Sequence, residues 1–371
     1  MLTPAIGAYG RDVAPTNRIF VLGAGFSAAA GLPLANDLLP KIFNIEEKFF
    51  RVNGYSHLRN AINQYSKYLL ETSENNHFSI EDFAAWLDWE HTLELKGSDT
   101  YSDHANEPGL QLRWAIGKIL NDQIPTHIPD VYLDFAQILN TSDRIITLNY
   151  DLLVERSLSQ VGVPYRRFPD RFSEVNEYYG TVDNDQPQEL VLSKLHGSID
   201  WSYMKDTSWS KMPPLLPLTE GVRFHEDPLL KIGVIQEFNI KDYYSKTSYL
   251  YEFPPLLFPP SSAKPLGKSP LIPIWRGIGM ASNWYSGLNM IGCSLPPGDP
   301  YVKQLIYQIA TEFTLSDKDF FGNKKRRMKV VTLQSTSEQR IEYKKRTKFF
   351  NPKKTDYYFE GLSSAVIQEL T

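Results

Sequence analysis

Short, largely apolar runs recur along this chain, and each one ends in a polar cluster. The runs span residues 18–22, 144–148 and 191–195, and their length and composition are typical of strands buried in a parallel sheet. Residues 288–292 and 328–333 fit two more strands. Helical patterns separate these runs, so the sequence predicts an α/β fold in which a parallel sheet carries helices on both faces.

A long helical stretch follows the first run. Within it, Ser79-Ile80-Glu81-Asp82 resembles a capping box, and the residues after it are apolar on one helical face. We therefore expect residues 45–140 to form a helical insertion after the first strand. Residues 1–17 are expected to be an N-terminal arm, and residues 18–44 and 141–371 to form one core.

The remaining segments carry weaker patterns. Residues 165–190 and 200–250 are polar, aromatic and irregular, which predicts long loops over the polar clusters. Residues 251–258 fit a further strand. Residues 299–313 and 358–370 place apolar side chains at helical spacing, so we expect two helices there, the second of which closes the chain.

Composition is that of a soluble globular protein. The chain has 371 residues, 42% hydrophobic and 22% charged, and its net charge of −4 excludes an overall basic nucleic-acid binder. No run approaches the ~18 apolar residues of a membrane span, and the amino terminus lacks a leader pattern. Cys293 is the only cysteine, which excludes a thiolate zinc cluster and makes the cytoplasm the expected compartment.

One segment departs from this charge balance. Residues 322–354 contain twelve Lys or Arg against two Glu. A solvated face with a flexible loop explains such a run, and so does a docking surface for an acidic partner or nucleic acid. The sequence leaves both interpretations open.

Three polar clusters follow the first three runs: Gly23-Ala24-Gly25-Phe26-Ser27, Asn149-Tyr150-Asp151 and His196-Gly197-Ser198. Carboxyl ends of parallel strands meet at one edge of a sheet, where ligands bind. A glycine turn before a helix aims backbone N–H groups at a pyrophosphate. The amide and carboxylate of the second cluster suit ribose hydroxyls, or else a turn and a helix cap. The histidine of the third is either a general base or structural.

A hydride-transfer dehydrogenase is disfavoured. That class expects an acidic residue about 20 positions after the glycine turn, at the end of a second strand. In this chain the corresponding zone is residues 44–47, which lie inside a helical pattern.

The order of the three clusters resembles that of sirtuin-like proteins. In that family a Gly-Ala-Gly-x-Ser loop, an Asn-x-Asp and a His-Gly build the NAD site of a Rossmann-like core. Gly292-Cys293-Ser294-Leu295 is similar to a fourth family element, which holds the adenosine side, so the resemblance spans roughly residues 18–335. The candidate cofactor-binding residues are Gly23, Ala24, Gly25, Phe26, Ser27, Pro33, Asn149, Asp151, Gly292, Ser294 and Leu295.

Departures from the protein-deacylating sirtuins narrow this resemblance. Those enzymes carry a four-cysteine zinc ribbon, whereas residues 200–250 contain no cysteine, so we expect no metal. Residues 32–37 also lack the Phe and Arg of the deacylase loop. Both features resemble bacterial sirtuin-like effectors of anti-phage defence, which hydrolyse NAD until the infected cell is depleted.

The resemblance implies an NAD+ hydrolase that releases ADP-ribose and nicotinamide. Backbone N–H groups of residues 24–27 would hold the phosphates, Asn149 a ribose hydroxyl or water, and Asp151 the ribose or developing charge. His196 would be the base, which makes Asn149, Asp151 and His196 the candidate catalytic residues. Asp37 and Asp299 lie near the site by position only.

Two alternative functions stay open. One is an NAD-dependent ADP-ribosyltransferase or deacylase, and the other is a non-catalytic sensor of NAD or ADP-ribose. By resemblance, activity is gated by a translocase-type ATPase, a short Argonaute protein or self-assembly into a homo-oligomer. Residues 322–354 are the candidate contact, nucleic acid is reached only through the partner, and no membrane is involved.

Overall fold

The computed structural model describes residues 17–45, 51–52, 55–73, 77–96, 105–168, 172–176, 180–183, 189–205, 222–223, 230–235, 237–245, 254–259, 261–262, 271–275, 278, 282–295 and 299–371. The expected N-terminal arm therefore lies outside the described residues, except for Asn17.

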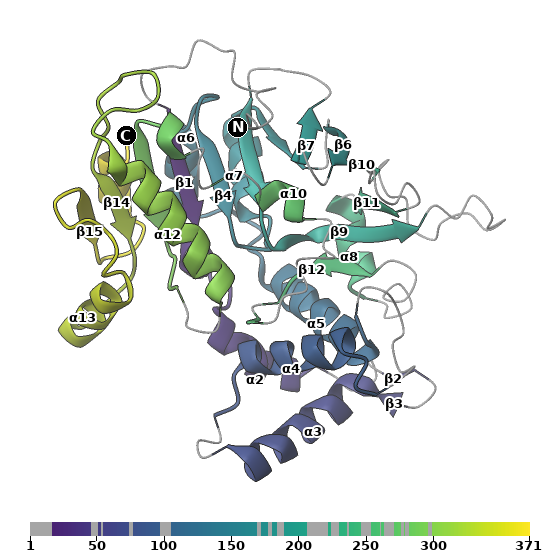
Figure 1. Cartoon of the computed structure of the whole chain (residues 1–371). Helices are drawn as coiled ribbons and strands as arrows, with labels where there is room; N and C mark the ends of the chain where they lie inside the picture. Colours follow the sequence, from purple (N-terminus) through teal and green to yellow (C-terminus); the bar gives the residue numbers. More distant parts are fainter. Residues whose placement is uncertain are drawn as a thin grey trace.

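Seven parallel strands form the main sheet (Figure 1). Their order across the sheet is β15 (Thr355–Tyr358), β14 (Met328–Val331), β13 (Gly287–Ile291), β1 (Arg18–Leu22), β4 (Arg144–Thr147), β8 (Leu190–Lys194) and β5 (Tyr165–Arg167). The chain starts at the centre with β1, builds one side, and then returns to the other side with β13. Ligands of open α/β sheets bind where strand order reverses in this way.

Helices cover both faces of this sheet, as predicted. Side chains of β1 alternate between the faces: Phe20 packs edge-on against Phe135 of α6 (Asp130–Gln137), in one apolar core. Ile19 belongs to the opposite core, which includes the apolar side of α12 (Pro300–Leu315). Figure 1 shows α12 crossing in front of the strands while α6 and α7 (Leu153–Val161) lie on the other side.

The stretch between β1 and β4, which includes the predicted insertion at residues 45–140, is mostly helical. Its elements are α1 (Ala24–Ala28), α2 (Ala35–Phe43), the short pair β2 (Arg51–Val52) and β3 (Tyr55–Ser56), α3 (His57–Thr72), α4 (Ile80–Thr92), α5 (Glu107–Gln123) and α6. Side-chain oxygens of Ser56, Ser79 and Asn106 cap α3, α4 and α5. Helices α2 to α5 gather below the sheet in Figure 1, next to the carboxyl end of β1.

The two segments expected to be long loops contain strands instead. A second, antiparallel sheet has the order β10 (Val222–Arg223), β11 (Leu230–Val234), β9 (Gly197–Lys205) and β12 (Pro255–Leu257), and β6 (Phe172–Asn176) pairs with β7 (Gly180–Asp183). Helix α8 (Glu237–Tyr243) follows β11. The sequence pattern did not reveal β9, because Asp200 and its neighbour Trp201 are both buried. Asp200 is paired with Arg167, so a polar residue in this strand does not mark an exposed position.

The carboxyl-terminal prediction was partly wrong. Tyr358 ends β15, and the closing helix α14 (Ser364–Glu369) begins only at Ser364. Ser363 is its N-cap, and its side chain accepts a hydrogen bond from the Val366 N–H. Helix α13 (Ser337–Arg346) precedes this last strand. The pattern of residues 275–284 also fits a helix, but only part of this range lies within the described residues. Trp275 ends the short α10 (Ile272–Trp275), and Ser282–Trp284 form a 3-10 turn, η4.

Two further findings concern the described residues only. None of their helices combines the length and apolar character that a membrane crossing requires. Nowhere among them do three or more His, Cys, Asp or Glu side chains gather in a way that suits a metal ion.

Candidate functional site

A cavity of about 130 Å³ lies where β1, β4, β8 and β13 end. All three predicted polar clusters reach it, and so does the loop after β13. Of the predicted residues, those that line it are Gly23, Ala24, Ser27, Pro33, Asn149, Asp151, His196, Ser294 and Leu295. Gly25, Phe26 and Gly292 are not among the lining residues.

Gly25 and Gly292 instead bring two backbones together. The Gly25 N–H donates to the Gly292 carbonyl at 2.9 Å, and a Cβ at Gly25 would lie 2.8 Å from the Gly292 Cα. Gly292 has a φ of +69°, and a side chain there would collide with the Phe26 nitrogen. Both positions therefore require glycine for close approach and backbone conformation rather than for ligand contact.

Phe26 anchors the loop in the core. Its ring meets Tyr132 and Phe135 edge-on, and its carbonyl accepts a hydrogen bond from the Tyr132 hydroxyl at 2.7 Å. The Phe26 N–H donates to the Gly23 carbonyl at 2.8 Å. The N–H groups of Gly25 and Phe26 are therefore engaged within the protein, whereas Ala24 and Ser27 line the cavity.

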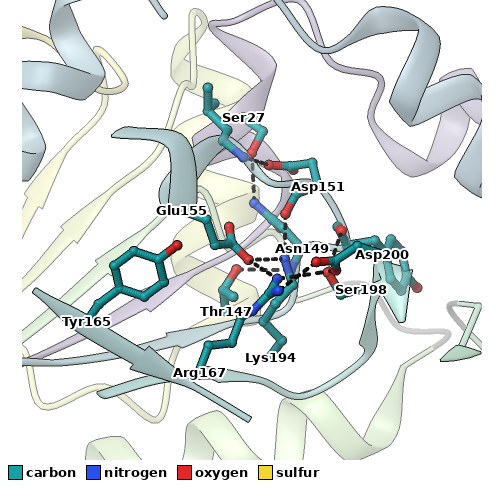
Figure 2. Close-up of polar contacts among 12 residues, drawn as sticks. Ser27, Thr147, Asn149, Asp151, Glu155, Tyr165, Arg167, Lys194, Ser198 and Asp200 are labelled. Carbon is teal, nitrogen blue, oxygen red and sulfur yellow. Dashed lines mark hydrogen bonds and ion pairs between the residues drawn. The ribbon is translucent and has the colours of Figure 1, made fainter. Parts of the chain in front are cut away.

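Asn149 joins the second cluster to the first. Its Nδ2 donates to the Gly23 carbonyl and to the Ser27 hydroxyl, each at 3.0 Å. Figure 2 shows Asn149 reaching up to Ser27 from the strand end. A side-chain amide has two N–H donors, so both are used by the loop. The Oδ1 is then the atom that Asn149 offers to a ligand, as an acceptor.

Asp151 has a local structural role as well as a place in the cavity. Its Oδ1 accepts from Leu153 N–H at 3.0 Å, at the start of α7, and its carboxyl also hydrogen-bonds Ser27. Burial raises the pKa of Asp151, and the nearby charge of Lys194 opposes this rise. The N-cap of α7 is Leu152, which has no side-chain cap bond, so Asp151 forms a turn before the helix and not the predicted cap.

The His196 ring lies near two aromatic rings. The Tyr150 and Trp275 rings lie 6.1 and 5.9 Å from its centroid, at 32° and 29° to its plane. The Tyr150 hydroxyl donates to the Phe258 carbonyl at 2.5 Å, and Trp275 Nε1 donates to Leu195 O at 3.0 Å. Because both neighbours are fixed to the backbone, they restrict the orientation of the imidazole at the cavity wall.

Two carboxylates in the cavity were missed or undervalued. Glu81 comes from the first turn of α4, and Asp299 caps α12, accepting from Val302 N–H at 3.2 Å. Asp299 Oδ2 lies 3.9 Å from His196 Nε2. Ser79 and Asp82 cap α4 reciprocally, and Glu81 lies between them in the first turn. Asp37 accepts from Leu34 N–H and does not line the cavity.

A buried ion-pair network lies behind the second cluster (Figure 2). Lys194 Nζ donates to the Asp151 carbonyl at 2.5 Å and to Glu155 at 2.9 Å. Arg167 bridges Glu155 at 3.0 Å and Asp200 at 2.6 Å. Strands β5, β8 and β9 and helix α7 supply these residues. The network therefore ties the Asn149–Asp151 turn to the sheet behind it.

Helix α13, in the basic segment, contacts the loop after β13. The Tyr343 hydroxyl donates to the Cys293 carbonyl at 2.8 Å, and Arg346 donates to the Ser294 carbonyl at 3.2 Å. Leu295, in the same loop, has a φ of +51°, which is unfavourable for a residue with a Cβ. Two hydrogen bonds from α13 thus help to hold a strained loop that lines the cavity.

A family model described as a SIR2-like domain matches residues 143–211. The matched segment holds β4, Asn149 to Asp151, and His196 to Ser198, so it carries two of the three polar clusters. No curated protein matches the sequence.

Solved structures of sirtuins have a similar arrangement. Sir2Tm bound to a propionylated peptide is 12% identical, with a TM-score of 0.36 over 95% of this chain and 91% of that chain. A Sir2 homologue mutant in complex with ADP-ribose is 12% identical, with a TM-score of 0.35 over 99% and 93%. A structure that addresses the structural basis of sirtuin substrate affinity is 13% identical, with a TM-score of 0.37 over 96% of this chain and 93% of that chain.

Proposed function

We propose that this protein hydrolyses the bond between nicotinamide and ribose in NAD+ and releases ADP-ribose and nicotinamide. The observation that carries this proposal is the convergence of Ser27, Asn149 and His196 on one cavity, at the point where strand order reverses. The SIR2-like match over residues 143–211 supports NAD as the nucleotide.

The residues present suit the chemistry of this cleavage. As the glycosidic bond breaks, its electron pair goes to the nicotinamide nitrogen and the ribose becomes oxocarbenium-like. Nicotinamide leaves as a neutral molecule, so no strong acid is required. Asn149 Oδ1 accepts a hydrogen bond from a ribose hydroxyl or from the attacking water. His196 accepts the proton that this water or hydroxyl gives up.

Orientation is the larger contribution in this scheme. Holding the reactants in place lowers such a barrier by about 7–11 kcal/mol, whereas one general base contributes about 10²- to 10⁴-fold. The engaged amide of Asn149 and the stacked ring of His196 support a preorganised site. Asp151, buried beside Ser27, adds negative charge near the ribose.

The sequence between residues 200 and 250 favours water over a peptide as the acceptor. Deacylating sirtuins carry a four-cysteine zinc ribbon there, which helps to form the acceptor groove, whereas these residues contain no cysteine.

We further propose that the NAD+ loss serves anti-phage defence and that a partner controls it. The partner would be a translocase-type ATPase, a short Argonaute protein or another copy of this chain. Basic side chains of α13 are largely exposed, and the same helix holds the Cys293–Leu295 loop. Contact at α13 would therefore act directly on the cavity wall.

Mass spectrometry of the products tests the reaction. The purified chain is incubated with NAD+, with and without an acyl-lysine peptide, and all products are quantified. Equal amounts of free ADP-ribose and nicotinamide, unchanged by the peptide, are expected. Acyl-ADP-ribose or ADP-ribosylated protein would indicate a deacylase or transferase. If NAD+ is not consumed even when the partner is present, the protein is a non-catalytic sensor and not an enzyme.

A further inference from the structure

One end of the cavity is acidic. Glu81 and Asp299 both line it, are nearly excluded from solvent, and come from the first turn of α4 and the cap of α12. Burial raises the pKa of Glu81, and the charges of Asp82 and then Asp299 add to this rise. Burial also raises the pKa of Tyr150, followed by the charges of Asp299 and Glu81. The two carboxylates and Tyr150 all line the same cavity.

The charges that line the cavity are predominantly negative. Asp151, Glu81 and Asp299 are among the described lining residues, and no Lys or Arg is. Lys194 lies behind Asp151, bonded to its carbonyl, and Arg113 approaches Tyr150 without lining the cavity. A buried region with this sign favours a cation and disfavours a pyrophosphate.

NAD+ carries both kinds of charge, at different ends. The pyridinium ring of nicotinamide is positive, and the pyrophosphate is negative. Ala24 and Ser294 are exposed at the mouth of the cavity, whereas Asp299 and His196 are buried. The distribution orients the dinucleotide with its phosphates at the mouth and its nicotinamide riboside end inside.

We propose that Glu81 and Asp299 form the subsite for the cationic nicotinamide riboside end of NAD+, and that Asp299 is a catalytic residue. This inference rests on the proposed hydrolysis and adds a carboxylate to it. Asp299 Oδ2 is 3.9 Å from His196 Nε2, too far for a direct hydrogen bond and close enough for both to face one substrate atom.

The positive charge moves during the reaction, and Asp299 is placed to follow it. When the carbon–nitrogen bond breaks, the pyridinium becomes neutral and the charge passes to the ribosyl carbon and its ring oxygen. The Asp299 carboxylate stabilises this cation. Water then forms the new carbon–oxygen bond and gives its proton to His196. The balance is NAD+ plus water to ADP-ribose, nicotinamide and one proton.

Comparing NAD+ with NADH separates the effect of ligand charge from that of ligand shape, because the dihydronicotinamide ring of NADH is neutral. Binding of NAD+ and NADH is measured by calorimetry in a His196→Ala background, which slows turnover. We expect NAD+ to bind at least about tenfold more tightly than NADH. Asp299→Asn and Glu81→Gln should each bring this ratio toward one, while Asp299→Glu retains it.

Rates are measured in the otherwise native chain. Asp299→Asn should lower kcat by about 10²- to 10³-fold, and asparagine keeps the helix cap. Asp37→Asn is the matched control, since Asp37 also accepts a backbone N–H at a helix start but does not line the cavity. It should keep the parental rate. If Asp299→Asn does not fold, the rate and the NAD+/NADH binding ratio of Glu81→Gln are compared with those of the parental chain instead.

The outcomes separate this subsite from the hydrolysis itself. If the parental chain releases nicotinamide but Asp299→Asn and Glu81→Gln keep both its rate and its NAD+/NADH ratio, the acidic subsite is overturned. If no nicotinamide is released under any condition, the proposed function is wrong. A charge-dependent binding ratio would then still support the subsite.

Discussion

Asn149 donates a hydrogen bond to the hydroxyl of Ser27 at 3.0 Å, although 122 positions separate the two residues. This bond, with the one to the Gly23 carbonyl, joins the turn after β4 to the loop after β1. It also fixes which atom of Asn149 is left for a ligand. The two polar clusters therefore act as one unit.

Replacing Asn149 should affect activity more than stability. Asn149→Ala removes the free Oδ1 and both donors, so we expect nicotinamide release to fall at least about 10³-fold. Loss of these hydrogen bonds should lower the free energy of unfolding by only about 1–3 kcal/mol. Ser27→Ala, which keeps the bond to Gly23, is the control and should lose less activity. Substantial turnover by Asn149→Ala would refute its assigned contact.

Gly292 should be intolerant of any side chain. It has a φ of +69° and abuts the Phe26 nitrogen, whereas Gly162 has a φ of +81° with nothing near its missing side chain. Gly162→Ala should cost about 1–2 kcal/mol from backbone strain alone. Gly292→Ala should cost more and also abolish NAD+ binding. Urea unfolding and calorimetry measure the two effects, and equal costs at both positions would contradict the close approach.

The sequence predicted the sheet better than its surroundings. The strand at Arg18–Leu22 was placed without error, because its local apolar pattern is enough to identify it. Strand β9 was not predicted, because its buried Asp200, which is paired with Arg167, has the polarity of a loop residue. Tyr358 and Leu370 were assigned to one helix because the turn between strand and helix leaves the apolar spacing unbroken.

The site was predictable wherever its residues follow strands. Ser27, Asn149 and His196 are near one another because parallel strands end at one edge. Glu81 was not predictable in this way, since the path of α4 relative to the sheet depends on how the insertion packs. Phe26 was predicted to be a cofactor-binding residue, but its side chain is buried in the apolar core.

The network behind the site should make stability depend on acid pH. Burial raises the pKa of Asp200, but the charge and hydrogen bonds of Arg167 outweigh this effect and lower it overall. The resulting stability is present above the unfolded pKa of about 3.9 and is lost as pH falls through the folded value. Asp200→Asn should cost about 3–5 kcal/mol at neutral pH.

The measurement is the free energy of unfolding between neutral and acid pH. The parental chain should lose stability below pH ~4, and Asp200→Asn should show a shallower slope there. Asp356→Asn removes a partly exposed pair with Arg327 and serves as the control, with a change of at most about 1 kcal/mol. Parallel pH profiles for Asp200→Asn and the parental chain would exclude this role.

Helix α13 should control the cavity through Tyr343. Tyr343→Phe leaves the Cys293 carbonyl without that donor, so we expect a loss of about 1–3 kcal/mol and a higher KM for NAD+. Lys345→Ala, on the exposed side of the same helix, should change stability by less than about 0.5 kcal/mol and leave KM unaltered. An unchanged KM in Tyr343→Phe would argue that the loop holds its shape without α13.

The rate of nicotinamide release by the parental chain and by His196→Ala tests the central claim most directly. The account predicts NAD+ cleavage by the parental chain and a loss of about 10²- to 10⁴-fold in His196→Ala, with the variant still folded and still binding ADP-ribose. Cleavage by His196→Ala at the parental rate would contradict the account.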